Sequence, residues 1–186
     1  MITVGELRKG ITIELDDQLF NVLDYEHIKM GRGGAVVRLK LRNLRSGYTF
    51  ERTFPASEKF RRVYLERKKV QYLYHDDDLY HFMDTDTFEQ MALTGEQLGS
   101  DVNYLKEGLV VDLLTHNDVP IGVELPVTVD LTVTETEPGF KGDTATGGTK
   151  PAILETGMKI NVPLFINIGD VVKVDTRTGE YIERVS

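Results

Sequence analysis

The 186-residue sequence contains no cysteine. This absence excludes disulfides, thiolate catalysis and cysteine metal sites, and it suits a reducing compartment. No apolar run approaches the ~20 residues that a membrane-spanning helix needs, and the N-terminus shows no basic-then-apolar secretory signal. We therefore expect a cytoplasmic protein without membrane contact.

The sequence also has few residues arranged for catalysis or metal binding. It shows no nucleophile-elbow, paired-carboxylate or triad pattern, and its four histidines stand without a carboxylate or a second histidine at ligand spacing. The run Asp76-Asp77-Asp78 lies between two expected strands and lacks EF-hand spacing, which favours a solvated turn over a metal site. We expect no enzyme activity, no metal and no cofactor.

Charge is distributed unevenly along the chain. The net charge is −8, but residues 1–64 carry an excess of +4, whereas residues 65–126 carry −9 and residues 127–186 carry −3. Because counterion release depends on local basic surface, a basic head on an acidic body is compatible with RNA binding. The acidic part would discourage indiscriminate binding.

Short strand-like runs dominate, which predicts an all-β chain. Runs over 11–15, 18–25, 35–41 and 48–54 form a meander typical of a small closed barrel, followed by an expected helical turn over 57–63. Two later sets of about five strands are typical of oligonucleotide-binding (OB) barrels. Residues 94–106 are the expected helix, broken near Gly99. The pattern predicts three domains, over 1–64, 65–126 and 127–186.

One loop stands out because three glycines frame a single arginine. The segment Lys29-Met30-Gly31-Arg32-Gly33-Gly34 lies between the expected strands 19–28 and 35–41. Glycine permits positive φ and a close approach of the backbone to a partner, so the loop is suited to placing Arg32 in a narrow anionic site. A phosphate-binding loop is disfavoured, because a strand rather than a helix follows the glycines.

A second glycine-rich loop runs from Phe140 to Lys150 in the third domain. Its aspartate and threonines can hydrogen-bond base edges or a 2′-hydroxyl, and its lysines favour phosphate. The sequence leaves open whether it is an RNA contact or a plain connector.

Three segments together carry a family resemblance. Residues 150–169 read KPAILETGMKINVPLFINIG, with lysine, alanine, glycine and a Val-Pro pair where the family has them, and the tail 174–181 matches the family's ending. With the arginine loop, they resemble bacterial translation elongation factor P of the arginine-tip type over essentially the whole chain.

The resemblance implies a fold and a function. The fold is an N-terminal SH3-like (KOW-type) barrel followed by two OB-fold barrels in an elongated L shape. The function is that of a monomeric, non-enzymatic elongation factor that binds the 70S ribosome between the P and E sites. It would stimulate peptide bond formation and relieve stalling at consecutive prolines by positioning the P-site tRNA.

The resemblance also implies roles for individual residues. Arg32 would contact the CCA end of the P-site peptidyl-tRNA and is a candidate modification site, with a supporting loop of Lys29, Gly31, Gly33 and Gly34. The E-site codon of the mRNA would be contacted by Gly142, Asp143 and Thr144. The small subunit or the tRNA would be contacted by Tyr181 and Arg184.

The tip departs from the commonest family pattern. Many members carry a modified lysine there, and Arg32 excludes lysine-directed chemistry. Arginine-type members that are rhamnosylated usually have asparagine after the arginine, whereas Gly33 follows here. Whether an arginine-modifying glycosyltransferase is a partner therefore stays open. The alternative function is general single-stranded RNA binding by the OB barrels, which their acidic balance disfavours.

Overall fold

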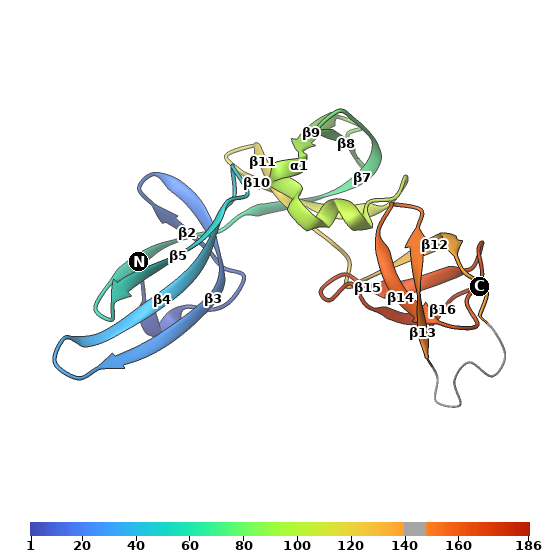
Figure 1. Cartoon of the computed structure of the whole chain (residues 1–186). Helices are drawn as coiled ribbons and strands as arrows, with labels where there is room; N and C mark the ends of the chain where they lie inside the picture. Colours follow the sequence, from blue (N-terminus) through green and yellow to red (C-terminus); the bar gives the residue numbers. More distant parts are fainter. Residues whose placement is uncertain (140–147) are drawn as a thin grey trace. The chain divides into compact units, whose positions relative to one another are not determined.

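The structure is a computed structural model that describes residues 1–139 and 148–186 (Figure 1). Within those residues almost all regular structure is β, in three sheets, which confirms the predicted all-β class. No helix in these two ranges is long and apolar enough to cross a membrane.

The first sheet has six strands in the order β1-β6-β2-β3-β4-β5. In chain order the strands are β1 (Ile2–Thr3), β2 (Thr12–Leu15), β3 (Gln18–Met30), β4 (Gly34–Asn43), β5 (Thr49–Pro55) and β6 (Lys59–Val63), with a 3₁₀ turn over Val4–Glu6. The helical turn expected over 57–63 is wrong. Most of that segment is β6, which pairs with both β1 and β2 and buries Phe60.

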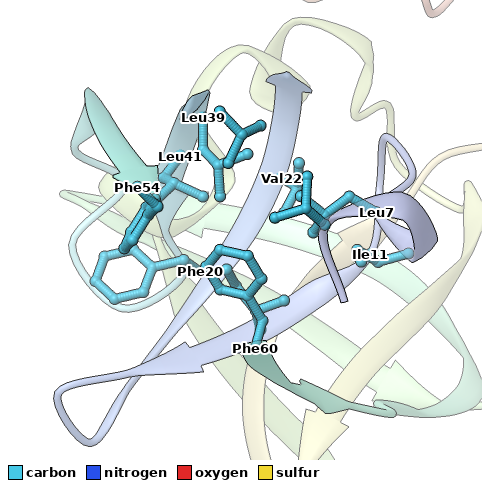
Figure 2. Packing of buried hydrophobic residues seen from close by; sticks show 11 residues of the cluster. Leu7, Ile11, Phe20, Val22, Leu39, Leu41, Phe54 and Phe60 are labelled. Carbon is cyan, nitrogen blue, oxygen red and sulfur yellow. The ribbon is translucent and has the colours of Figure 1, made fainter. Parts of the chain in front are cut away.

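The core of this first sheet is aliphatic and aromatic. Figure 2 shows Leu39 and Leu41 of β4 with Val22 of β3 and the ring of Phe60. Phe54 and Phe60 meet edge to face with their ring centroids 5.1 Å apart. Alternate β4 residues point into this core because a strand has a side-chain period of two, and the intervening residues face solvent.

The middle sheet has five strands in the order β11-β10-β7-β8-β9. Its strands are β7 (Glu66–Asp76), β8 (Leu79–Asp84), β9 (Gln90–Thr94), β10 (Val110–His116) and β11 (Val119–Glu124). The expected helix over 94–106 is two short pieces, α1 (Gly95–Leu98) and a 3₁₀ helix over Gly99–Tyr104. The two pieces meet at Gly99, whose φ of 58° cannot continue a right-handed helix.

The third sheet has the order β14-β13-β12-β15-β16. Its strands are β12 (Thr128–Thr136), β13 (Thr149–Leu154), β14 (Lys159–Pro163), β15 (Val171–Asp175) and β16 (Tyr181–Arg184). Its core is mainly aliphatic and also takes in Tyr104 from the 3₁₀ helix.

The chain divides into two compact units. The first comprises 1–68, 93–99 and 113–122, and the second comprises 69–92, 100–112 and 123–186. The middle sheet thus contributes segments to both units, and the boundaries at 64/65 and 126/127 stay predictions.

Candidate nucleic-acid interface

The arginine loop is the turn of a long antiparallel hairpin. The β3–β4 ladder runs from Phe20 opposite Asn43 to Met30 opposite Gly34, with one bulge between Val22 and Asp24. The turn between the strands consists of Gly31, Arg32 and Gly33. The predicted position of the arginine at a hairpin tip is therefore correct (Figure 1).

The end of the hairpin is held by backbone pairing rather than by packing. Among the side chains that the structure describes, the last buried one toward the tip is Val37 of β4, which lies opposite His27. Beyond it, Ile28 and Val36 face each other half-buried, and Arg32 is exposed. The side chain of Arg32 can thus meet a partner without disturbing the core.

The structure explains the glycine at one position of the tip but not at the other two. Gly34, the first residue of β4 after the three-residue turn, has φ +79°, a left-handed conformation that favours glycine. Gly31 and Gly33 have no positive φ, and a Cβ on either would meet nothing within 4 Å. The fold therefore requires glycine at Gly34 but leaves Gly31 and Gly33 unexplained within the chain.

Carboxylates lower on the hairpin have partners of their own. Glu26 lies 3.7 Å from Arg38 across the ladder, and Asp24 lies 3.4 Å from Lys9. The backbone N–H of Tyr25 donates to Asp24 and, together with Lys9, holds the pKa of that carboxyl below its ordinary value.

The two cations nearest the tip are Lys29 and Arg32. Within residues 1–139 and 148–186, Lys29 and Arg32 have no carboxylate partner. The tip consequently presents uncompensated positive charge, which suits an anionic partner such as a phosphate backbone.

The C-terminal candidates lie on the edge strand β16. Tyr181 is half-buried against the third core, opposite Val174. The guanidinium of Arg184 lies over the exposed ring of Phe165, 5.5 Å from its centroid. Arg184 is thus already engaged with an aromatic ring, yet it stays exposed and can offer its N–H groups.

The codon-contact candidates Gly142, Asp143 and Thr144 lie outside the described residues. The structure does describe the residues on either side of them. The two site groups, Arg32 in the first unit and Tyr181 with Arg184 in the second, belong to different units.

Sequence reasoning missed a histidine–carboxylate pair on the β7–β8 hairpin. Nε2 of His81 lies 2.8 Å from Asp76, and the His81 ring stacks on Tyr74 with centroids 4.6 Å apart. The spacing of the histidines in the sequence did not indicate this pair. In the described ranges no three acidic or histidine side chains gather where they could hold a metal ion.

Three family models match successive parts of the chain. They are the elongation factor P KOW-like domain over residues 3–60, the elongation factor P OB domain over 65–123 and the elongation factor P C-terminal model over 129–184. Elongation factor P of Acetivibrio thermocellus is 53% identical over 185 residues, covering 100% of both chains. The chain belongs to the elongation factor P family. Elongation factor P of Moorella thermoacetica is 56% identical over 184 residues, covering 99% of this chain and 100% of the relative.

Membership confirms the broad prediction from the sequence. Elongation factor P is a translation elongation factor and not an enzyme, and the family's KOW-like and OB domains match the predicted fold. A solved structure, eukaryotic translation initiation factor 5A from Methanococcus jannaschii, is similar at 22% identity with a TM-score of 0.48. That similarity covers 67% of this chain and 90% of the other.

Proposed function

We propose that this elongation factor P binds the cytoplasmic 70S ribosome between the P and E sites and stimulates peptide bond formation at consecutive prolines. It would do so by positioning the P-site peptidyl-tRNA. The observation that carries the proposal is the exposed Arg32 at the end of a paired hairpin, with no carboxylate partner in the described residues.

Proline explains why positioning alone would raise the rate. Its fixed φ and secondary amine give poor attack geometry, and a misplacement of about 1 Å can lower a rate by ~10²-fold. The ribosome supplies the chemistry, so the factor needs no nucleophile or general base. It needs only to hold the CCA end of the tRNA.

Arg32 is suited to that task by its chemistry. Its planar guanidinium donates charge-assisted hydrogen bonds in a fixed fork, whereas lysine offers a point charge. Gly31 and Gly33 leave the backbone beside Arg32 without Cβ atoms, so RNA can approach closely. Lys29, on the adjoining strand end, adds a second cation for the phosphate backbone.

The remaining contacts are assigned with the same function. We propose that Gly142, Asp143 and Thr144 contact the E-site codon, and that Tyr181 and Arg184 contact the small subunit or the tRNA. Modification of Arg32 by a glycosyltransferase is compatible with its exposure, and mass measurement of the native chain decides it.

The proposal is tested by synthesis of a reporter with three consecutive prolines in a reconstituted translation system that lacks this factor. We expect the native chain to restore synthesis, Arg32→Ala to fail and Arg32→Lys to restore it only partly. The matched control is Lys159→Ala, which removes an exposed cation on β14. We expect this variant to keep full activity. A proline-free reporter should respond to none of them.

Failure of the native chain to restore synthesis with ribosomes of its own organism would overturn the proposal. Nanomolar binding to random single-stranded RNA at physiological salt would then favour a general RNA-binding protein. The combined −12 charge of residues 65–186 argues against that outcome.

A further inference from the structure

We propose that Arg42 is a positioning residue that fixes the direction of the β3–β4 hairpin, and hence of Arg32, against the segment that contains α1. The inference rests on the proposed function of Arg32 and assigns a second residue to it. Arg42 and α1 lie in the same compact unit.

Arg42 joins two segments that are far apart in the sequence. It lies on β4, and its Nη2 donates a hydrogen bond to the backbone carbonyl of Gln97 at 3.1 Å. Carbonyls in the last turn of a helix lack intrahelical partners, so the guanidinium satisfies one that α1 leaves open. The half-buried Arg42 side chain thereby holds the base of the hairpin on the end of α1.

Two glycines permit this close contact. A Cβ on Gly99, the C-cap of α1, would overlap Nη2 of Arg42 and lie 3.2 Å from its Cζ. A Cβ on Gly47 would overlap the carbonyl oxygen of Glu96. Both glycines have positive φ, so their conformation and the space around them both favour glycine.

Both sides of the contact are held by local hydrogen bonds. On the hairpin side, Asn43 Oδ1 accepts from the N–H groups of Arg45 and Ser46 at 2.8 and 3.1 Å. On the other side, Thr94 and Gln97 form a capping box at the start of α1. Arg42 therefore joins two segments that each have hydrogen bonds of their own.

The contact around Arg42 is narrow. A hollow of about 810 Å³ lies beside it, and its lining includes Asn43, Arg45, Gln97 and Val119. Strand pairing of β3 with β2 and of β4 with β5 holds the hairpin in its own sheet, so a tilt here would move that sheet against the segment that contains α1. The hollow leaves open space between the two, and the hydrogen bond from Arg42 to Gln97 joins them across it.

The length of the hairpin amplifies any tilt. At a strand rise of about 3.3 Å per residue, Gly34 lies roughly 26 Å along β4 from Arg42. A tilt of about 5° at the base would move the tip by about 2 Å, enough to lower a positioned reaction by ~10²-fold. Loss of the Arg42 contact should therefore reduce the rate more than it reduces binding.

The test combines a distance measurement with kinetics. Because the chain has no cysteine, spin labels can be attached to Ala35→Cys and Val119→Cys in the first unit. We expect a narrow distance distribution in the parent, a distribution at least twofold broader in Arg42→Met, and an intermediate one in Arg42→Lys. Arg45→Met, which removes an exposed guanidinium from the same turn, is the control and stays narrow.

The kinetic arm measures triproline synthesis against factor concentration without the labels. Arg42→Met should lower the maximal rate about tenfold or more, with a half-saturating concentration changed less than about threefold. A narrow distribution or a parent-like maximal rate in Arg42→Met would overturn the inference. If Arg42→Met does not fold, Arg42→Lys is judged by the same criteria. An inactive parent would instead overturn the proposed function, while the distance widths would still decide whether Arg42 fixes the hairpin.

Discussion

Lys150 donates a hydrogen bond from its Nζ to the backbone carbonyl of Glu137, 2.5 Å away, although the lysine is only 7% exposed. Glu137 precedes residues 140–147 in the chain, and Lys150 follows them. Burying an ammonium is unfavourable unless it is hydrogen-bonded, so this bond accounts for the lysine at the start of β13.

Lys150→Met should therefore destabilise the second unit. The change keeps the approximate length of the side chain but removes a charged donor, which typically costs about 1.5–3 kcal/mol of unfolding free energy. Urea unfolding monitored by circular dichroism measures the change. Lys159→Met, an exposed lysine on β14, is the control and should leave the midpoint unchanged; equal midpoints for both variants would contradict the argument.

Alanine substitutions at the tip should separate folding from function. The Cβ added in Gly33→Ala would contact no neighbour, and the φ of Gly33 is not positive. The melting temperature should therefore stay within about 1 °C of the parent value, consistent with about ±0.5 kcal/mol for a surface change. Gly34→Ala forces alanine to φ +79° and should cost about 1 kcal/mol. We expect triproline synthesis to fall in Gly33→Ala nonetheless. Full activity there would mean that RNA does not approach this backbone.

Tyr72 should make the fold sensitive to alkaline pH. Burial, and to a smaller extent Tyr80, raises its pKa to about 12. Since the neutral form is favoured in the folded state, its contribution is complete below pH 10 and is lost as pH rises toward 12. The loss amounts to at most about 3 kcal/mol.

Tyr72→Phe checks that dependence. The variant should flatten the fall in stability between pH 10 and 12, and should remove one late-titrating tyrosine from the absorbance titration at 295 nm. It also removes the 3.3 Å contact of the hydroxyl with His75, so a small loss at neutral pH is expected. Tyr48→Phe, at a tyrosine 68% exposed, should leave the alkaline profile unchanged.

Gly139 should resist substitution for a packing reason. Its φ is not positive, yet a Cβ there would overlap the backbone oxygen of Leu164 and lie 3.0 Å from the Leu164 Cβ. Gly139→Ala should cost about 1–3 kcal/mol by forcing that backbone to move. Gly122→Ala, where a Cβ meets nothing within 4 Å, should leave the unfolding midpoint almost unchanged.

The sequence predicted most of the strands because their signal is local. Alternation over 35–41 and the turn at Ser46-Gly47 are sufficient to place β4 and the start of β5. β6 was misread as a helical turn because its support comes from β1 and β2, which pair with it from distant parts of the chain. Such non-local pairing can override weak local preference.

In the candidate site, too, the sequence predicts the local features and not the contacts between distant residues. Arg32 was predicted at a hairpin tip, because its glycines and the flanking strands are adjacent in sequence. The Arg42–Gln97 contact joins residues 55 positions apart, and no local sequence pattern predicts it. His81 meets Asp76 across a ladder with a register shift between Tyr72 and Tyr74, which no periodicity in a single sequence indicates.

The exposed end of the β3–β4 hairpin has a consequence for how this protein can evolve. Among the described side chains, the buried core reaches no further than Val37, whereas the side chain offered to the partner lies beyond it at Arg32. Exchange of one cation for another at that position, or covalent extension of it, leaves the folding equilibrium untouched. Natural selection can therefore change the side chain that contacts the partner without destabilising the domain that carries it.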